Sequence, residues 1–371
     1  MNSLFFLWLA LGTPQTIEAR MTAILDEVRI KENIPGLAAA VIRSEGPVYV
    51  AVSGKRRQDA DARLTREDRM HIGSCTKAIT STLMARLVAD RILAWDTQLL
   101  EVFPELKGKL HPAYQHINLR DLLSHTAGVV PSGDFEPWLK NHPPDVKALA
   151  ALKGDAAAQR LAMLVPILSM KPVVAPKTAL SYSNAGYAIA AAMAERRTGK
   201  TWEWLIESKV LKPLGMPGMH VGWPGALKSL KQPVGHVRDN GTFRVCENDE
   251  IKLPLSLTPA GHLSGRPEDL ALFLRLHLRG LRDLPTIMLD PAMFTLIHQP
   301  VKEDYGLGWG KYRNRKGVLV PWHNGSIGSY VTQMVVMPGD DLAVATFSNA
   351  GMASEPATVR AAQRIIRLFD E

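Results

Sequence analysis

The stretch H-I-G-S-C-T-K, residues 71–77, leads into the largely apolar run A-I-T-S-T-L-M-A-R-L-V-A. The spacing of the apolar residues in that run predicts a helix that begins close to Ser74. Residues i and i+3 of a helix share one face, so Ser74 and Lys77 would lie side by side. The N–H groups at a helix N-terminus have no intrahelical partner and favour negative charge. The stretch therefore predicts either an activated serine or, more simply, a helix cap followed by an exposed lysine.

The chemistry of an activated serine fits this spacing. A serine hydroxyl needs a base to become a nucleophile, and a neutral lysine can act as that base. Burial, or a neighbouring cation, lowers the pKa of a lysine from its reference value of about 10.4. A backbone N–H at the same helix end could stabilise the oxyanion of an acyl-transfer intermediate. The motif S-x-x-K occurs once in the chain, but short motifs recur by chance, so it needs companions.

Composition limits the classes of protein to be considered. The chain has 371 residues, of which 46% are hydrophobic and 22% charged, so it can form one large or two intimate domains. Its formal net charge is +8, but Lys and Arg are spread along the sequence. That distribution predicts a solvated basic surface and no nucleic-acid site.

Cysteine usage argues against a metal or cofactor. The two cysteines, Cys75 and Cys246, are far apart in sequence, and neither C-x-x-C nor H-E-x-x-H occurs. We therefore expect no metal site and no cofactor. A single disulfide remains an alternative, but two unlinked thiols are the simpler interpretation.

The N-terminal run S-L-F-F-L-W-L-A-L-G, residues 3–12, is too short to span a bilayer. It is typical of a signal segment over about residues 1–15, which favours export to the periplasm or the exterior. However, no Lys or Arg precedes the run, and the first is Arg20. The alternative is an apolar element that packs on the body of a cytoplasmic protein.

The order of predicted elements suggests the architecture. We expect a helix over residues 16–31, a hairpin of strands 37–42 and 48–52, a mostly helical middle over 118–222, a helix over 267–278, strands 319–322, 330–337 and 342–347, and a closing helix over 355–369. Within the middle, we expect L-R-D-L-L-S-H-T-A-G to be helical up to a C-cap at Gly128, and helices over 185–197 and 202–211.

The simplest fold with this order is α+β. One antiparallel sheet is built from both chain ends and flanked by the terminal helices, and a mostly helical lobe completes the molecule. We predict a single catalytic domain over residues 16–371, with an α/β lobe of about 16–93 and 225–371 and a helical lobe of about 94–224. A cleft between such lobes is a usual place for a functional site.

A second candidate motif is S-Y-S-N, residues 181–184, which precedes a predicted helix. Tyr182 could relay a proton between a lysine and a serine, and Asn184 could offer its amide to the lysine and to a substrate carbonyl. Alternatively, Tyr182 packs in a turn and Asn184 caps the helix. A further Y-x-N at residues 312–314 lies in a basic segment that we interpret as solvated surface.

A third motif is W-H-N-G-S-I-G-S-Y, residues 322–330, which opens a predicted strand. Gly325 lets another backbone approach closely. The strand edge could bind an extended ligand, with His323 facing the cleft and the Ser326 N–H serving as a second oxyanion donor. The alternative is an ordinary histidine followed by a glycine bulge, and a second H-x-G at residues 71–73 shows how easily the pattern arises.

Together the three motifs resemble those of the penicillin-recognising serine hydrolases, in the branch of class C β-lactamases, D-alanyl-D-alanine carboxypeptidases and related esterases. That family carries S-x-x-K, Y-x-N and K-T-G or H-x-G in this order, here at residues 74–77, 182–184 and 323–325. Further similarity lies in L-L-S-H-T-A-G (122–128), V-L-K-P-L-G-M (210–216), P-A-G-H-L-S-G-R-P-E-D-L (259–270) and Y-G-L-G-W-G (305–310). It covers the chain from about residue 17 to the end.

The resemblance implies a β-lactamase/transpeptidase-like fold and a role for each motif residue. Ser74 would be the acylated nucleophile, with Lys77 and Tyr182 as the proton-transfer pair. The residues that would bind substrate are Asn184, His323, Gly325 and Ser326. The N–H groups of Ser74 and Ser326 would form the oxyanion hole, and His125 would be structural. The substrate would be a small molecule or a peptide.

The third motif departs from Lys-Thr-Gly. In family members that hydrolyse β-lactams, a lysine there helps to hold the carboxylate of the drug. A histidine is mostly neutral at pH 7, so this attraction is weaker. The sequence therefore favours a hydrolase of D-Ala-peptide-like or ester substrates. The alternatives are a true β-lactamase and a catalytically silent peptidoglycan-peptide binding protein. An α/β-hydrolase is excluded because G-x-S-x-G is absent and strands do not alternate with helices.

Overall fold

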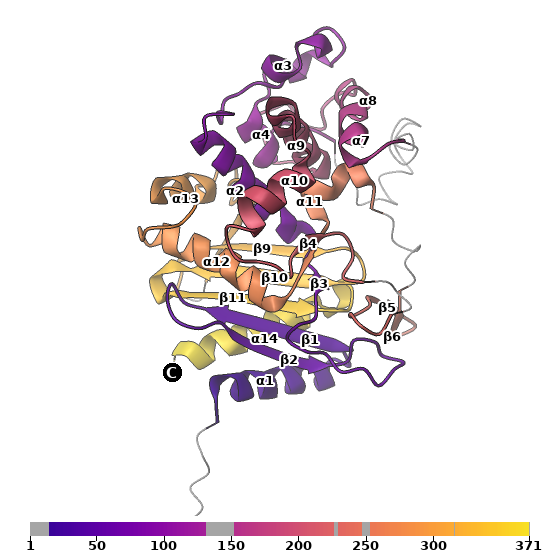
Figure 1. Cartoon of the computed structure of the whole chain (residues 1–371), viewed down its shortest axis with the longest axis vertical. Coiled ribbons are helices and arrows are strands. Elements are labelled where there is room, and N and C mark those ends of the chain that lie inside the picture. The colour runs from indigo at the N-terminus through magenta and orange to yellow at the C-terminus, as the bar shows by residue number, and fades with distance from the viewer. Residues whose placement is uncertain (1–14, 131–151, 226–228, 247–252, 315, 371) are drawn as a thin grey trace, which may run out of the picture.

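The computed structural model describes residues 15–130, 152–225, 229–246, 253–314 and 316–370 (Figure 1). Its central element is a six-stranded sheet with the order β2-β1-β11-β10-β9-β8, in which every neighbouring pair is antiparallel. The strands are β1 (Gly36–Ile42), β2 (Tyr49–Gly54), β8 (Gly310–Arg313), β9 (Leu319–Ser326), β10 (Val331–Met337) and β11 (Leu342–Ser348). The predicted α+β fold, with one antiparallel sheet built from both chain ends, is confirmed.

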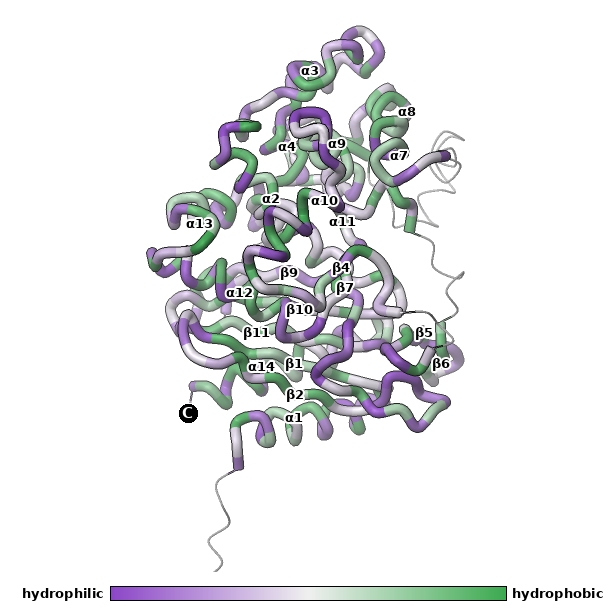
Figure 2. The backbone as a smooth tube through the Cα atoms, in the orientation of Figure 1, coloured by the Kyte–Doolittle hydropathy of each residue, from purple (hydrophilic) through white to green (hydrophobic). Residues whose placement is uncertain are grey.

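Strand β1, with the sequence GLAAAVI, is buried along its whole length, and its side chains pack on both faces of the sheet. Because side chains alternate along a strand, Ala38, Ala40 and Ile42 enter one hydrophobic core. Leu37, Ala39 and Val41 enter the other. Figure 2 shows the central strands as a mainly green layer between helices. The sheet is therefore the middle of three layers.

The terminal helices cover one face of this sheet. Helix α1 (Ile17–Lys31) begins at Thr16, whose hydroxyl accepts a hydrogen bond from the Ala19 N–H at 3.2 Å, a usual N-cap. Helix α14 (Glu355–Asp370) packs beside α1 and against β10 and β11. On the opposite face, α12 (Pro267–Leu281) packs on β1, β10 and β11. The helices predicted at both chain ends are confirmed (Figure 1).

The remaining helices and two small sheets complete the molecule. The helices are α2 (Thr76–Ala89), α3 (Leu99–Val102), α4 (Leu119–Leu123), α7 (Ala156–Ala162), α8 (Leu164–Leu168), α9 (Asn184–Thr198), α10 (Trp202–Ile206), α11 (Thr258–Gly261) and α13 (Pro291–His298). The small sheets are β3 (Met70–His71) with β7 (Leu263–Gly265) and β4 (His220–Val221), and β5 (His236–Asp239) with β6 (Thr242–Val245). The helices gather at one end of the molecule (Figure 1). The exact lobe boundaries stay a prediction.

One predicted helix is wrong in its extent. The segment L-R-D-L-L-S-H-T-A-G was expected to be helical up to Gly128, but α4 ends at Leu123. A capping box between Asn118 and Asp121 fixes the start of the helix. The chain then leaves the helical conformation at His125, whose φ of 59° is left-handed, and the Thr126 N–H returns to the Asp121 carbonyl. The left-handed residue and this backbone hydrogen bond end the helix early, as in a usual C-terminal cap.

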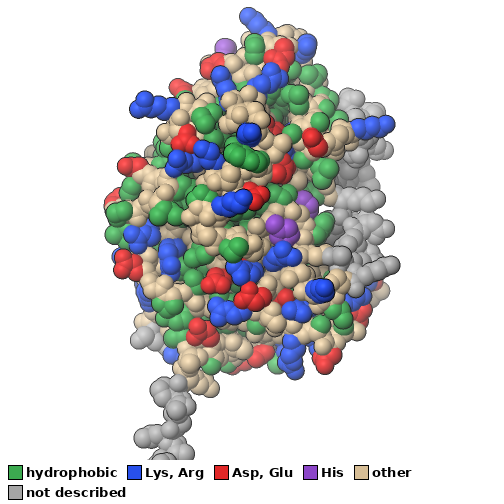
Figure 3. Space-filling model, viewed as in Figure 1, with side chains coloured by type: hydrophobic (Ala, Val, Ile, Leu, Met, Phe, Trp, Pro, Cys, Tyr) green, Lys and Arg blue, Asp and Glu red, His purple; other side chains and the backbone are tan. Residues whose placement is uncertain are grey.

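The distribution of surface charge and the state of the two cysteines agree with what the sequence predicts. On the face shown in Figure 3, blue basic and red acidic side chains are interspersed and form no basic stripe. Cys75 and Cys246 are both buried and are not joined in a disulfide. No helix within the described ranges is both long and apolar enough to cross a membrane.

Arg160 of α7 joins the helices at the helical end. Its side chain is completely buried, and its guanidinium donates to Glu195 of α9 at 3.2 Å and to Glu203 of α10 at 2.8 Å. A third contact, at 2.9 Å, goes to the hydroxyl of Thr258. A planar guanidinium can satisfy several acceptors at once, so this one residue links α7 to α9, α10 and α11, the last of them 98 positions away in the chain.

We expect Arg160→Met to lower the free energy of unfolding by about 3–5 kcal/mol, because it leaves two partly buried carboxylates without their cation. Urea unfolding of the variant measures this loss. The matched control is Arg196→Met, which removes the exposed Arg196–Glu105 ion pair and should change the midpoint little. Equal midpoints for the two variants would contradict the prediction.

Candidate active site

Ser74 lies in a tight turn between strand β3 and helix α2. The Ile72 N–H donates to the Leu263 carbonyl at 2.9 Å, which holds the end of β3 against β7. Residues Gly73–Cys75 then form a 3₁₀ turn, and α2 follows at once. Gly73 has a φ of 51°, and a Cβ on it would lie 2.5 Å from the Ser326 nitrogen. Only glycine meets both demands at this point.

Lys77 is the residue around which the site is arranged. Its side chain is fully buried at the start of α2, and its Nζ lies 3.0 Å from Ser74 Oγ. The same nitrogen lies 2.6 Å from Asn184 Oδ1 and 2.8 Å from the Ala260 carbonyl oxygen. The last two atoms can only accept, so they take two of the amine hydrogens. The third position on the nitrogen faces the serine hydroxyl, where a neutral amine would present its lone pair.

Tyr182 stands beside this amine. Its ring centroid lies 4.7 Å from Lys77 Nζ, and the ring of His125 packs against it at 4.2 Å between centroids. His125 also holds the loop that carries the tyrosine. Its carbonyl accepts from the Ser181 N–H at 2.7 Å, and its Nδ1 accepts from the Ser183 N–H at 3.0 Å. The left-handed turn at His125 therefore fixes the Y-S-N segment.

Residues Gly73–Cys75 carry the predicted nucleophile, and we call them the nucleophile turn. Strand β9 approaches this turn closely at Gly325. A Cβ on Gly325 would lie 2.0 Å from the Ile72 carbonyl oxygen and 2.8 Å from the Ser74 nitrogen. Together with the contact between Gly73 and the Ser326 nitrogen, this brings the backbone of Ser74 next to the end of β9. The Ser74 and Ser326 N–H groups thus belong to neighbouring backbones, as a two-donor oxyanion site requires.

His323 of β9 is 5% exposed and is held on both ring nitrogens. Its Nε2 lies 3.0 Å from the Tyr305 hydroxyl, and its Nδ1 lies 2.5 Å from the Asn324 carbonyl oxygen. Since a carbonyl only accepts, Nδ1 carries the proton and Nε2 accepts from the tyrosine. Burial lowers the pKa of His323 to about 3. The imidazole is therefore neutral at pH 7, with no positive charge to offer a carboxylate.

The structure brings all of the predicted motif residues into one region. Two groups of this region were not predicted from the sequence. They are the Tyr305 hydroxyl, which is hydrogen-bonded to His323, and the Ala260 carbonyl, which accepts a hydrogen bond from Lys77. Tyr305 occurs in the quoted Y-G-L-G-W-G motif, but nothing in that pattern distinguishes a site residue from a core residue. Burial raises the pKa of Tyr305 and lowers that of His125, so both groups are uncharged at neutral pH.

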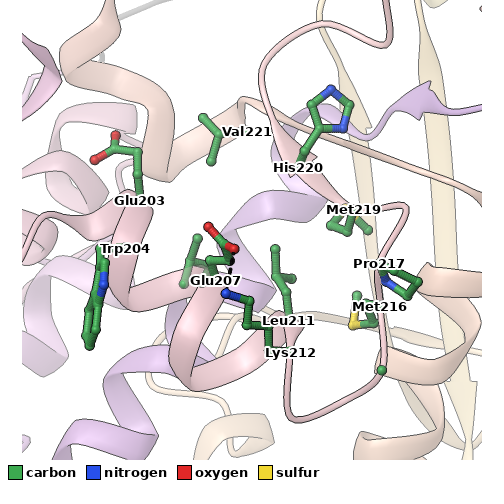
Figure 4. Close-up of a pocket in the computed structure, with 12 residues that line it drawn as sticks. Glu203, Trp204, Glu207, Leu211, Lys212, Met216, Pro217, Met219, His220 and Val221 are labelled. Carbon is green, nitrogen blue, oxygen red and sulfur yellow. Dashed lines mark ion pairs between the residues drawn. The ribbon is translucent and has the colours of Figure 1, made fainter.

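A separate cavity of about 970 Å³ lies between α10 and the segment that leads into β4 (Figure 4). Its walls are mainly apolar, with Leu211, Met216 and Met219 among them, and an ion pair of 2.9 Å joins Glu207 and Lys212 in its lining. No residue of the S-x-x-K, Y-x-N or H-x-G motif is among its lining residues. Its size alone does not make it the reactive site, because Ser74 and Lys77 lie elsewhere.

Comparison with known proteins identifies the family. The model of the beta-lactamase family matches residues 15–367. The chain belongs to the beta-lactamase family. Members of this family are serine hydrolases, and the S-x-x-K, Y-x-N and H-x-G motifs all lie within the matched range.

Individual relatives are distant. The chain is 26% identical over 340 residues to penicillin-binding protein 4 of Amycolatopsis lactamdurans, an alignment that covers 89% of this chain and 84% of the relative. It is 24% identical over 343 residues to unguisins hydrolase ungD' of Aspergillus campestris, covering 87% of this chain but only 60% of that longer protein. The octameric penicillin-binding protein homologue from Pyrococcus abyssi superposes with a TM-score of 0.75 at 22% identity, covering 94% and 77% of the two chains. The last similarity establishes the fold.

We expect Gly325→Ala to lower the free energy of unfolding by about 1–3 kcal/mol, because the added methyl group overlaps the backbone of the nucleophile turn. Denaturant unfolding measures the change. Gly339→Ala is the matched control, since a Cβ there meets nothing within 4 Å, and it should leave the midpoint almost unchanged. An unchanged unfolding midpoint for Gly325→Ala would show that β9 does not approach the turn closely.

We also expect stability to fall with acid. Burial lowers the pKa of His262 to about 4 and of His323 to about 3, whereas an unfolded histidine titrates near 6.5. Below pH 6.5 the unfolded chain binds protons that the folded chain refuses, so stability rises with pH. Each such histidine costs up to about 1.4 kcal/mol per pH unit below 6.5. Unfolding midpoints at pH 7.5, 6.5 and 5.5 test this, and a flat profile would contradict it.

Proposed function

We propose that the protein hydrolyses amide or ester bonds through an acyl-enzyme on Ser74. The observation that carries this proposal is the surroundings of Lys77 Nζ, which lies 3.0 Å from Ser74 Oγ while Asn184 and the Ala260 carbonyl accept its other hydrogens. A neutral lysine held in this way points its lone pair at the Ser74 hydroxyl. Neutral Lys77 then acts as the general base.

The reaction has two stages. Lys77 takes the proton of the Ser74 hydroxyl while Oγ attacks the substrate carbonyl, and the N–H groups of Ser74 and Ser326 stabilise the resulting oxyanion. The bond to the leaving group then breaks, and Tyr182, next to the lysine amine, passes a proton to the departing amine or alcohol. The Tyr182 phenolate then deprotonates a water molecule that attacks the acyl-enzyme, and Lys77 returns its proton to Ser74 Oγ as the acid is released. Asn184 orients both Lys77 and the substrate carbonyl.

The substrate class we propose is a D-Ala-peptide-like amide or a small ester. An extended substrate would run along β9 past His323 and Gly325, where backbone groups can bind it without a charge. His323 is neutral and engaged with Tyr305, so it supplies no cation for the carboxylate of a β-lactam. This disfavours efficient β-lactamase activity. The presence of penicillin-binding and hydrolase names among the relatives is consistent with the proposed class.

We expect Ser74→Ala to abolish turnover and acylation, because the bond-forming oxygen is removed. Intact mass is followed over time after addition of a penicillin, and in parallel with a nitrophenyl ester and a D-alanyl-D-alanine peptide. The expected result is a Ser74-dependent adduct with the penicillin that decays slowly, together with turnover of the ester or the peptide. The Ser74→Ala variant, with its fold checked by circular dichroism, is the control.

Other outcomes assign the alternatives. Fast loss of the penicillin, dependent on Ser74, would make the protein a true β-lactamase and contradict the argument from His323. Binding of the peptide without any adduct or turnover would make it a silent peptidoglycan-peptide binding protein. Turnover that survives in Ser74→Ala would place the chemistry at another residue and overturn the proposal.

We further propose that the protein is exported to the periplasm or the exterior, on the strength of the apolar run at residues 3–12. This run lies outside the described residues. N-terminal sequencing of the mature protein tests the proposal, because removal of about the first 15 residues supports export and an intact N-terminus supports a cytoplasmic location.

A further inference from the structure

Three histidines lie close to the nucleophile turn without a role in the proposed reaction. In the small sheet, His71 of β3 and His220 of β4 both stand opposite Ser264 of β7, and His262 immediately precedes β7. Trp223 packs on two of the rings, with centroids 5.1 Å from His71 and 5.7 Å from His262. In the part of the chain that the structure describes, no group of three or more His, Cys, Asp or Glu side chains is arranged to hold a metal ion.

Two of these histidines form a hydrogen-bonded chain with a fixed direction. The Gly73 N–H donates to Nδ1 of His71 at 3.0 Å, so this nitrogen carries no proton. The proton of the neutral His71 ring must then lie on Nε2, which is 3.0 Å from Nδ1 of His262. His71 therefore donates to His262, whose own proton lies on Nε2. Burial lowers the pKa of both histidines, which agrees with two neutral rings.

The two ends of this chain meet parts of the reactive site. Gly73 precedes Ser74 and has the left-handed φ that forms the nucleophile turn. Gly261, the residue before His262, lies against the nucleophile turn, since a Cβ on it would be 3.7 Å from the carbonyl carbon of Gly73. Two residues before His262 is Ala260, whose carbonyl accepts a hydrogen bond from Lys77. The histidine pair thus ties the turn that carries the nucleophile to the segment that orients its base.

We propose that His262 is a positioning residue, which holds His71 in the tautomer that accepts from the Gly73 N–H and so fixes the turn at Ser74 relative to Lys77. This inference rests on the proposed function of Ser74. If His262 loses its acceptor atom, the buried Nε2–H of His71 has no partner, which weakens the preference for this tautomer and lets the other one be populated. That tautomer points an N–H at the Gly73 N–H, and the turn must shift.

The test compares two substitutions at position 262. His262→Leu fills the space but accepts no hydrogen bond, and we expect the rate of Ser74 acylation by a nitrophenyl ester to fall about tenfold or more, as for a lost buried hydrogen bond, with KM changed less than about twofold. In His262→Asn, the side-chain oxygen can replace Nδ1 as acceptor, so this variant should recover most of the rate. Equal rates for the two variants would overturn the proposal.

Position 71 supplies a double-mutant cycle. The side-chain oxygen of His71→Asn can still accept from the Gly73 N–H but reaches no further toward His262. In that background, His262→Leu should have little additional effect, because the link is already broken. If His262→Leu costs the same factor in both backgrounds, it acts through packing and not through His71, and the proposal fails.

A readout other than activity is the tautomer itself. Nitrogen-15 spectra of histidine-labelled protein should show an unprotonated Nδ1 for His71 in the native protein and in His262→Asn, and a changed tautomer in His262→Leu. His298→Leu is the matched control, since it removes another buried histidine pair, 2.9 Å between His277 Nδ1 and His298 Nε2. It should lower the unfolding midpoint but leave acylation unchanged. A His262→Leu spectrum identical to the native one would overturn the inference.

Failure of this inference can be separated from failure of the proposed function. If Ser74→Ala is inactive while His262→Leu reacts like the native protein, only the positioning role falls. If Ser74→Ala retains activity, the proposed nucleophile is wrong, and the inference about His262 falls with it.

Discussion

The arrangement of the molecule around its reactive region depends on one buried amine. Lys77 Nζ is shared between Ser74 in the turn that precedes its helix, Asn184 at the start of α9 and the Ala260 carbonyl in α11. Burying a lysine amine without hydrogen-bond partners would raise the free energy of the folded state by several kcal/mol or more, so Lys77 can be buried only where these acceptors are present. Asn184 and Ala260 follow Lys77 by 107 and 183 positions, so three distant segments must meet at this nitrogen. The contacts of α2 with α9 and α11 bring them there.

The second constraint is steric. Ser74 lies next to the end of β9 only because Gly73 and Gly325 leave room for two backbones to approach, and a methyl group on either would overlap main-chain atoms. Strand β9 is in turn held in the sheet by β10, with His323 paired to Met334 in the register. The sheet thus positions the end of β9, and the turn that precedes α2 packs against it. Rigid elements of this kind position reacting groups more accurately than loops do.

Much of this could be predicted from the sequence, and the failures have physical causes. Apolar patterns predicted α1, α9, α12, α14 and five strands of the large sheet, because these elements bury many apolar side chains. Strand β8 was not predicted, because its sequence GKYR is mostly polar and partly exposed. The two small sheets were missed because strands of two to four residues are too short to show alternation. The early end of α4 was missed because it depends on the left-handed conformation of His125 and on the hydrogen bond from the Thr126 N–H to the Asp121 carbonyl. Propensity alone does not reveal such local competition.

For the site, the motifs predicted which residues meet but not what surrounds them. The partnership of His323 with Tyr305 joins residues 18 positions apart, and that of His71 with His262 joins residues 191 positions apart. Neither follows from spacing in the sequence. The same burial that excludes water also leaves His71, His125, His262 and His323 uncharged. Their contribution near the serine is therefore directional hydrogen bonding, which orients backbone and side chains without adding a charge that would compete with the lysine.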